Sequence, residues 1–389
     1  MDNIKKAIRP KEEDFADFSC YLTQLETYRI NQFNGFFFEK NNNSVLLDRN
    51  IIICSIKSAI EKHKSILEST KHLHSFNNDD EGLFIYIPNN ITLDTPLQVL
   101  DVIKTNEALK IESKTVIIIG ENSHVKLIYC DDTINDNISK TENKISVFLE
   151  ANSSLEYYKM ENINNSSSIF TDTNFVLNTN AQLKTFWLSI NGGDIKNKLN
   201  VSLEGEYSKA ELNGLYLVDR DQIVDSEVSV NHNKPNCHSN QLYKGILDDS
   251  AKAQFKGHIY VSKNAPYTEA IQNNRNILLT DKAIVNTQPF LEIYNDDVKC
   301  SHGATVGQLD ESAMFYMRSR GISERSAKML LMFAFCTEIL SKSSIEELVD
   351  TLQDIIKRRL HGELSSCENC VLLCSTPCGT SDVDMSKIN

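Results

Sequence analysis

The segment from Lys299 to Leu309 reads "KCSHGATVGQL" and places a cysteine and a histidine two residues apart. Thiolate sulfur and imidazole nitrogen bind zinc, iron and copper, and the same two groups can form a nucleophile–base pair. Residues i and i+2 of a strand point to the same side, so we expect Cys300 and His302 to project together. The alternative is a buried cysteine beside a histidine that bonds to the backbone.

A second group of thiols lies near the end of the chain, in "SSCENCVLLCSTPCGTSD". The spacing C-x2-C-x3-C-x3-C puts four thiols within twelve residues, which can enclose a zinc ion or an iron–sulfur cluster. Neither bacterial ferredoxins nor typical zinc ribbons have this spacing, and a tail with incidental thiols is the alternative. The four residues are Cys367, Cys370, Cys374 and Cys378.

Other candidates carry weaker signals. His232, Cys237 and His238 lie in the polar stretch "NHNKPNCHSNQ", where a turn on the surface is expected. Trp187 is expected in the core, and no role is assigned to His72 and His74. The scattered thiols are expected to be small buried hydrophobic groups: Cys20, Cys54, Cys130, Cys237 and Cys336.

Several functional classes are disfavoured by what the sequence lacks. It has no G-x-x-x-x-G-K-[ST], G-x-S-x-G or H-E-x-x-H motif, so no bound nucleotide is expected. A formal net charge of -13 argues against a nucleic-acid binder, which must neutralise phosphates. No apolar run approaches the ~20 residues of a membrane span, and the polar N-terminus does not resemble a signal peptide. We therefore expect a cytoplasmic protein that does not contact a membrane.

The elements that would position these residues fall into three groups. The first eighty residues show helical spacing, for example in Phe15, Phe18, Leu22 and Leu25 and in "NIIICSIKSAIEKHKSIL". From Leu83 onward short runs such as "TVIIIG", "HVKLIYC" and "TFWLSI" predict strands. Helical spacing returns after Gly307, with Gly321 and Ser323 as expected caps. Ser344 and Glu347 have the spacing of a capping box.

A weak repeat runs through the strand region. A small residue precedes an apolar one by two positions at steps of 30, 28, 29, 43 and 30 residues, and a period near thirty with one insertion favours a solenoid over the alternative β-sandwich. The small residues are Ser123, Ser153, Ala181, Ala210, Ala253 and Ala283. The predicted domains are a helical region at 1–82, a β-helix core at 83–307, a helical region at 308–364 and a cysteine-containing tail at 365–389.

The stretch from Ala253 to Ile322 resembles the SufB/SufD family of iron–sulfur cluster assembly proteins. The resemblance rests on "AQFKGHIYVSKNAPYTEAIQNNRNILLT" and "CSHGATVGQLDESAMFYMRSRGI", and continues more loosely into "AKMLLMFAF". Members of the SufB branch read "EHEAT" where this chain has "CSHGAT". Cys300, Gly303 and the following "TVGQLD" therefore resemble the SufD branch.

This resemblance implies a right-handed parallel β-helix flanked by N-terminal and C-terminal helical segments. It implies a heterodimer with a SufB-like paralogue through the β-helices, and a SufC-like ATPase docked on the C-terminal helices. Cys300 and His302 would contribute to nascent cluster formation or iron entry at the SufB interface, with the cluster or iron transient and shared. The chain would be a non-catalytic scaffold, with ATP hydrolysis by SufC and sulfur from a cysteine desulfurase.

The chain departs from the family pattern in its short N-terminal helical region and its four-cysteine tail, and a homodimer is also compatible with the sequence. Two functions from other classes stay open. The first is a cysteine-dependent hydrolase or transferase that uses Cys300 and His302. The second is a β-solenoid that binds carbohydrate in a groove of aromatic and carboxylate side chains.

Overall fold

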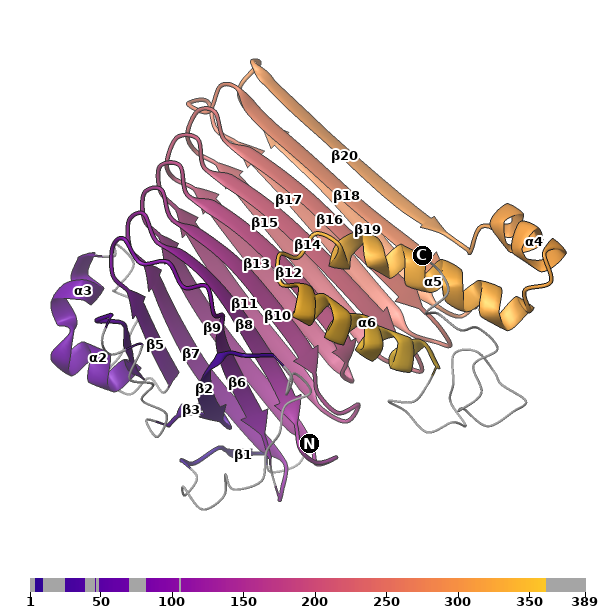
Figure 1. Ribbon diagram of the computed structural model, residues 1–389, viewed down its shortest axis with the longest axis horizontal. Helices are drawn as coiled ribbons and strands as arrows, with labels where there is room; N and C mark the ends of the chain where they lie inside the picture. The colour runs from indigo at the N-terminus through magenta and orange to yellow at the C-terminus, as the bar shows by residue number, and fades with distance from the viewer. Residues whose placement is uncertain are drawn as a thin grey trace.

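The structure is a computed structural model that describes residues 4–9, 25–38, 46, 49–69, 82–104 and 106–361. Strands make up 53% of the chain and form a β-solenoid of about eight turns, with helices near both ends (Figure 1). The predicted fold class, mainly β with a solenoid core and helical flanks, is confirmed. The β-sandwich alternative is wrong, because the stacked solenoid strands pair in parallel and sandwich strands are antiparallel.

Each turn of the solenoid contributes one strand to each of two sheets. The odd-numbered strands form sheet A: β5 (Gly82–Ile87), β7 (Leu109–Ile119), β9 (Ser139–Leu149), β11 (Ser168–Leu177), β13 (Asp194–Leu203), β15 (Ile223–His232), β17 (Lys252–Val261) and β19 (Ile284–Ile293). The even-numbered strands form sheet B: β6 (Leu97–Ile103), β8 (His124–Thr133), β10 (Ser154–Asn162), β12 (Gln182–Asn191), β14 (Lys209–Val218), β16 (His238–Leu247), β18 (Thr268–Leu278) and β20 (Val298–Gly307).

Alternating burial explains why these segments form strands. Every second residue of β11, β13 and β15 is buried, as expected when successive side chains point to opposite faces of a sheet. Phe175, Val201 and Val230 stack in register on the inward face, so each turn adds to one continuous core. Trp187 belongs to this core, which confirms its predicted place.

A ladder of asparagines fixes the turns that lead into sheet B. Asn90, Asn122, Asn152 and Asn180 have φ angles between 54° and 63°, a left-handed conformation that asparagine tolerates better than most residues. Each side-chain amide donates to the asparagine of the preceding turn, at 3.1, 3.1 and 2.9 Å. The bonded pairs are 32, 30 and 28 residues apart, so the ladder follows the period of the solenoid.

The structure corrects the reading of the weak repeat. Ser123, Ser153 and Ala181 each precede a strand of sheet B and are buried at equivalent corners, as predicted. Ala253, in contrast, lies in β17 of sheet A. The 43-residue step before it is therefore one and a half turns of the solenoid, and the predicted insertion is wrong. Small corner residues occur on both sheets, so the spacing alone could not separate them.

The N-terminal region contains more strand than its helical spacing predicted. It comprises β1 (Lys5–Lys6), β2 (Tyr28–Phe33), β3 (Phe36–Phe37), β4 (Ile52–Ser55), α2 (Ile56–Lys62) and α3 (Lys64–Ser69). Strand β2 pairs with β6 and extends sheet B, which buries Ile30 and Phe33. Phe15, Phe18 and Leu22 of the predicted helix lie outside the described residues. In the other predicted helical segment, Ile52–Ser55 pairs with β5 before the chain enters α2, because a short apolar run fits either state.

Three helices follow the solenoid: α4 (Glu311–Ser319), α5 (Glu324–Leu340) and α6 (Glu346–His361). Gly321 adopts a φ of +87° after α4, and Ser323 caps α5 by accepting a hydrogen bond from the Ser326 amide at 3.1 Å. Both predicted caps are confirmed. The hydroxyl of Ser344 differs from the prediction, because it bonds to Glu156 on β10. Within the described ranges no helix is both long and apolar enough to cross a lipid bilayer.

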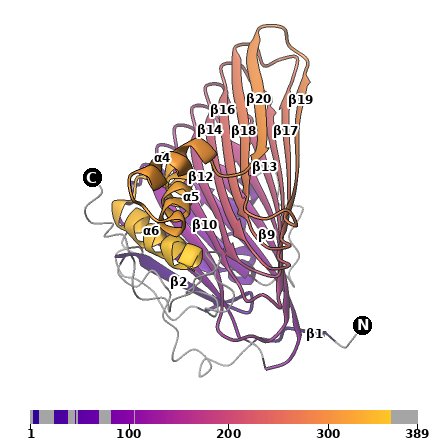
Figure 2. The same ribbon diagram turned by 90° about the vertical axis from the view of Figure 1, so that its right-hand side faces the viewer.

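The helices α5 and α6 pack on the outer face of sheet B (Figure 2). Arg359 of α6 forms a forked ion pair with Asp219 at 2.5 and 2.8 Å, and its Nε donates to the Ile190 carbonyl at 3.0 Å. Lys244 of β16 bonds to Glu338 and to the Phe335 carbonyl of α5. These buried charges fix both helices on the solenoid.

The two ends of the solenoid differ. At the first turn Phe37, Leu46 and Ile51 cover the core and are each at most 5% exposed. The terminal strands there, β3 and β4, are short and pair antiparallel to their neighbours. At the last turn β19 and β20 are ten-residue edge strands at the ends of their sheets. Among the residues that the structure describes, one end of the core is thus covered and the other is open.

Candidate functional site

Cys300 and His302 lie on β20, the terminal strand of sheet B at the open end. Cys300 is in register with Ala270 and His302 with Gln272, and both of those β18 residues are buried inward-facing positions. Stacked residues of a parallel sheet share a face, so Cys300 and His302 both point to the interior of the last turn. The predicted common orientation follows from this register.

The surroundings of Cys300 are apolar. The side chain is half-buried and packs against a cluster formed by Ile259, Val261, Ala265 and Ala270. Desolvation in this cluster raises the pKa of the Cys300 thiol, although a backbone hydrogen bond from Ala270 partly opposes the shift. The environment therefore stabilises the protonated thiol, which is a poor nucleophile.

His302 is exposed at the open edge, two residues from the Cys300 thiol, so the two side chains are placed to bind one metal ion together. In the part of the chain that the structure describes, no group of three or more His, Cys, Asp or Glu residues is arranged to hold a metal ion. Two side chains are too few for the four-coordinate sites typical of zinc and of iron in thiolate clusters. Any further ligands must come from outside the described residues.

Several large apolar side chains of the last turn or its exit are exposed. Phe290 on β19 is 59% exposed, and Ile284, Ile293, Tyr294 and Val306 are each more than a third exposed. Phe290 and Ile284 are in register with outward-facing residues of β17 and lie on the outer face of sheet A, whereas Ile293 and Val306 are in register with buried, inward-facing residues. Together with the unpaired edges of β19 and β20, Ile293 and Val306 form a surface suited to another protein. We call this surface the open end.

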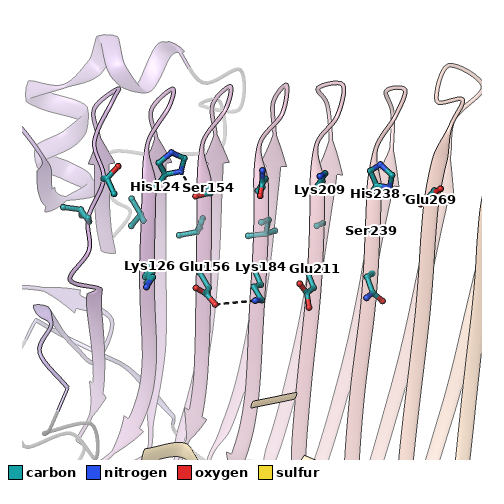
Figure 3. Close-up of a pocket in the computed structure, with 18 of the residues that line it drawn as sticks. His124, Lys126, Ser154, Glu156, Lys184, Lys209, Glu211, His238, Ser239 and Glu269 are labelled. Atoms are coloured by element: carbon teal, nitrogen blue, oxygen red, sulfur yellow. Dashed lines mark hydrogen bonds and ion pairs between the residues drawn. The ribbon is translucent and has the colours of Figure 1, made fainter. Parts of the chain in front are cut away.

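A groove of about 720 Å³ crosses the outer face of sheet B near the first residues of its strands (Figure 3). One row of its lining alternates in charge, with Lys126, Glu156, Lys184 and Glu211 on successive strands. Lys184 lies 3.9 Å from Glu156, and Lys342, which follows α5, lies 2.8 Å from Glu211. Neighbouring charges thus neutralise one another.

A second row of the groove contains a serine–histidine pair, in which Nδ1 of His124 lies 2.7 Å from Oγ of Ser154 (Figure 3). No ion pair joins His124 to a carboxylate among the described residues, so nothing orients the ring as a catalytic base requires. No Phe, Tyr or Trp is among the described residues that line the groove, which argues against carbohydrate binding. Sequence reasoning missed the groove because each of seven turns contributes only two or three of its residues, and the repeat was the signal that could have joined them.

Four charged side chains lie inside the solenoid: Asp101 on β6, Asp131 on β8, and Lys159 and Glu161 on β10. Each is at most 1% exposed, and Nζ of Lys159 lies 2.6 Å from Asp131. Desolvation by burial, followed by repulsion from Asp131, raises the pKa of Asp101 to about 7. We call these four residues the interior charge cluster, which the sequence did not reveal.

The other predicted candidates have mixed outcomes. His232 is fully buried, so the predicted surface turn is wrong for this residue, because β15 extends to it. Cys237 is buried at a corner of the core, as expected for the scattered thiols, and His238 begins β16 with its side chain 44% exposed. Burial lowers the pKa of His232 to about 3. Cys54, Cys130 and Cys336 are buried, as predicted. The residues outside the described ranges are Cys20, His72, His74, Cys367, Cys370, Cys374 and Cys378.

These features define a parallel β-solenoid with helices docked on one sheet and with a cysteine and a histidine on the last strand of that sheet. The chain belongs to the SufBD family of iron–sulfur cluster assembly proteins. Residues 102–335 match the family "SUF system FeS cluster assembly, SufBD core domain", and residues 3–99 match "SufBD protein N-terminal region".

Individual relatives confirm the resemblance to the SufD branch. The iron–sulfur cluster assembly protein SufD of Escherichia coli K12 is 33% identical over 244 residues, which cover 63% of this chain and 58% of that protein. A SufBD family protein of Synechocystis is 26% identical over 359 residues, covering 87% and 79%. Another from Mycobacterium tuberculosis H37Rv is 35% identical over 178 residues, covering 43% and 45%. The chain therefore spans less than two thirds of the length of E. coli SufD.

Proposed function

We propose that the chain is a scaffold subunit of a cytoplasmic SufB–SufC–SufD complex and has no catalytic activity of its own. The observation that carries this proposal is the open end, where Cys300 and His302 share one face of an unpaired edge strand. Iron and sulfide are the cargo. A cysteine desulfurase supplies the sulfur, and ATP hydrolysis belongs to a separate SufC-like ATPase.

The open end suits a SufB-like solenoid as partner. Edge strands present unpaired backbone N–H and C=O groups, and a second solenoid can satisfy them by continuing the sheets. Such a partner would also cover the exposed apolar side chains of Ile293 and Val306 on the last turn. It would bring its own ligands to Cys300 and His302, which completes a set that this chain only begins. A nascent cluster or an entering iron ion would then be shared between the two subunits.

The C-terminal helices suit the ATPase. Helix α4 begins four residues after β20 ends, and it has no buried residue. Its Phe315 and Tyr316 are 75% and 60% exposed, which is unusual for adjacent aromatic residues on a short helix. A partner that moves α4 would therefore act close to the strand that carries Cys300.

A cysteine-dependent hydrolase fits the structure less well. Catalytic thiols need a lowered pKa, and they obtain it from a nearby cation, a helix N-terminus or a paired histidine. Burial in the apolar cluster shifts the pKa of Cys300 in the opposite direction. A thiol of this kind becomes a ligand only when a metal ion displaces its proton.

The test is co-expression of the chain with a SufB-family protein and a SufC-family ATPase, followed by anaerobic purification. Cys300→Ala and His302→Ala should each leave the complex assembled and lower its bound iron and sulfide by about tenfold or more. Ser301→Ala is the matched control, because Ser301 lies between them and points to the outer face. If the chain copurifies with neither partner, the scaffold role is wrong. If both variants load as the wild type does, the role of the pair is wrong.

A further inference from the structure

A buried glutamine lies directly beneath His302 in the solenoid. Gln272 on β18 is in register with His302 on β20, so their Cα atoms are about 4.8 Å apart across the sheet. The side chain of Gln272 points inward and is 0% exposed. Its amide reaches over Gly257 on the opposite sheet, where a Cβ would lie 2.0 Å from Nε2 of Gln272. The glycine therefore makes the space that this amide occupies.

The side-chain amide of Gln272 is unsatisfied within the described chain. Neither Oε1 nor Nε2 has a hydrogen-bond partner among the described residues. A buried polar group without a partner destabilises a fold, so stability does not explain why the amide is there. One turn farther from the open end, Gln241 is in register with Gln272, is equally buried and also has no partner among the described residues.

We propose that Gln272 is a positioning residue for His302. The structure contains no hydrogen bond between the two side chains. His302 turns its ring toward this amide in another rotamer, so that Oε1 of Gln272 accepts a hydrogen bond from one ring N–H and the other ring nitrogen stays unprotonated at the open end. Histidines that bind metal ions almost always donate their second ring N–H in this way, and the bond fixes the tautomer and the orientation of the ring. The inference rests on the proposed function, because it takes iron as the ion that His302 receives.

The contact itself can be tested in the isolated full-length chain. Gln272→Met preserves the length of the side chain and removes the amide. Imidazole ¹⁵N shifts at pH 8, assigned with His302→Gln, should show one dominant tautomer of His302 in the wild type and a mixture in Gln272→Met. Gln241→Met is the matched control, because its Cα lies two strand spacings, about 9.6 Å, from His302. A mixture in the wild type, or an unchanged tautomer in Gln272→Met, overturns the proposal.

The consequence for the cargo is tested by anaerobic Fe²⁺ titration of the complex with both partners. Gln272→Met should lower the affinity for Fe²⁺ about 10- to 100-fold without lowering the melting temperature, whereas Gln241→Met should leave the affinity unchanged. A purely structural role would lower the melting temperature instead.

The two proposals fail in different ways. If Cys300→Ala and His302→Ala bind Fe²⁺ normally while Gln272→Met changes the tautomer, the proposed function fails and the contact stands. If those variants lose Fe²⁺ but Gln272→Met retains it, the proposed function stands and the positioning role fails.

Discussion

Cys300 and His302 have different surroundings although one residue separates them. The thiol faces Ala270 and the small apolar cluster, whereas the imidazole is exposed to solvent. Burial favours the neutral thiol, while exposure leaves the ring accessible to an incoming ion. Within one strand, the chain thus holds the thiol in its protonated form and leaves the imidazole exposed to solvent.

This difference predicts that the Cys300 thiol reacts slowly with alkylating agents. The raised pKa of Cys300 means that the isolated chain holds little thiolate at pH 7.5, so alkylation by iodoacetamide should be slower than for a free cysteine. The rate should rise steeply as the pH passes 9. Peptide mass mapping measures it, with Ser301→Cys in a Cys300→Ala background as the control on the outer face. A Cys300 rate at pH 7.5 that equals or exceeds the control contradicts the expected protonation.

Sequence could predict the pair but not its neighbour. The i, i+2 spacing placed Cys300 and His302 on one face without any tertiary knowledge. Gln272 contributes through a register that joins residues thirty positions apart. The partnerless amide becomes visible only when the opposite Gly257 is known to leave room for it. His232 was misplaced for the same reason, because its burial depends on how far β15 extends.

At the scale of elements, an ion pair between Arg359 and the buried carboxylate of Asp219 holds α6 on the solenoid. Asp219 is 2% exposed, and the Arg359 guanidinium satisfies both of its oxygens. The same guanidinium bonds to Gln222 at 3.1 Å. Forked arginine–carboxylate pairs are geometrically specific, so this contact sets the position of α6 as well as its stability.

Removal of this arginine should therefore be costly. Arg359→Ala leaves a buried carboxylate unpaired, and we expect the free energy of unfolding in urea to fall by about 3–5 kcal/mol. Arg358→Ala is the control, because the adjacent side chain is exposed and its loss should change stability by less than about 0.5 kcal/mol. Hydrogen exchange should localise the loss to α6. Equal effects of the two substitutions would show that the ion pair does not anchor the helix.

Helix α4 should behave in the opposite way. A combined Phe315→Ala and Tyr316→Ala variant removes exposed aromatic area, so its stability should stay within about 0.5 kcal/mol of the wild type. Binding of a SufC-family ATPase, measured by calorimetry, should weaken by about tenfold or more if these side chains anchor the interface. Ser319→Ala on the same helix should bind as the wild type does. Unchanged binding by the aromatic variant would place the ATPase elsewhere.

The elements show where pattern reasoning works and where it fails. The run "TFWLSI" became a strand, and all six of its residues are buried because the solenoid core covers one face of sheet B and the C-terminal helices cover the other. The helix predicted for "NIIICSIKSAIEKHKSIL" is wrong in its first part, because "IICS" forms a strand that pairs with β5, and the chain enters α2 only after this strand. Apolar residues in a short run fit both periods, and the pairing partner decides between them.

For the whole molecule, the interior charge cluster links stability to pH. Asp101 has a pKa near 3.8 when unfolded and about 7 when folded, so between these values the folded chain holds a proton that the unfolded chain releases. Its contribution to stability is fully present below about pH 4 and is lost as the pH rises through 7.

Asp101→Asn removes this dependence. At pH 8 the free energy of unfolding of the variant should be about 1–3 kcal/mol higher than that of the wild type, because the variant no longer buries a negative charge. At pH 4 the two proteins should be nearly equal. Urea unfolding at both pH values measures the difference, and Glu121→Gln at an exposed turn is the control. A wild-type stability that rises between pH 5 and 7 relative to Asp101→Asn would contradict the direction of the shift.

The unequal ends of the solenoid limit what can be built from it. A solenoid that could bind another copy at each of its two ends would form filaments, because head-to-tail contacts of this kind do not close. In the described residues the first turn is covered by Phe37, Leu46 and Ile51 and ends in the short strands β3 and β4, whereas β19 and β20 offer ten-residue edges. Two such solenoids that met through their open ends would each cover the long edges of the other. Contact of this kind would stop at two solenoids, with the junction at the centre of the pair.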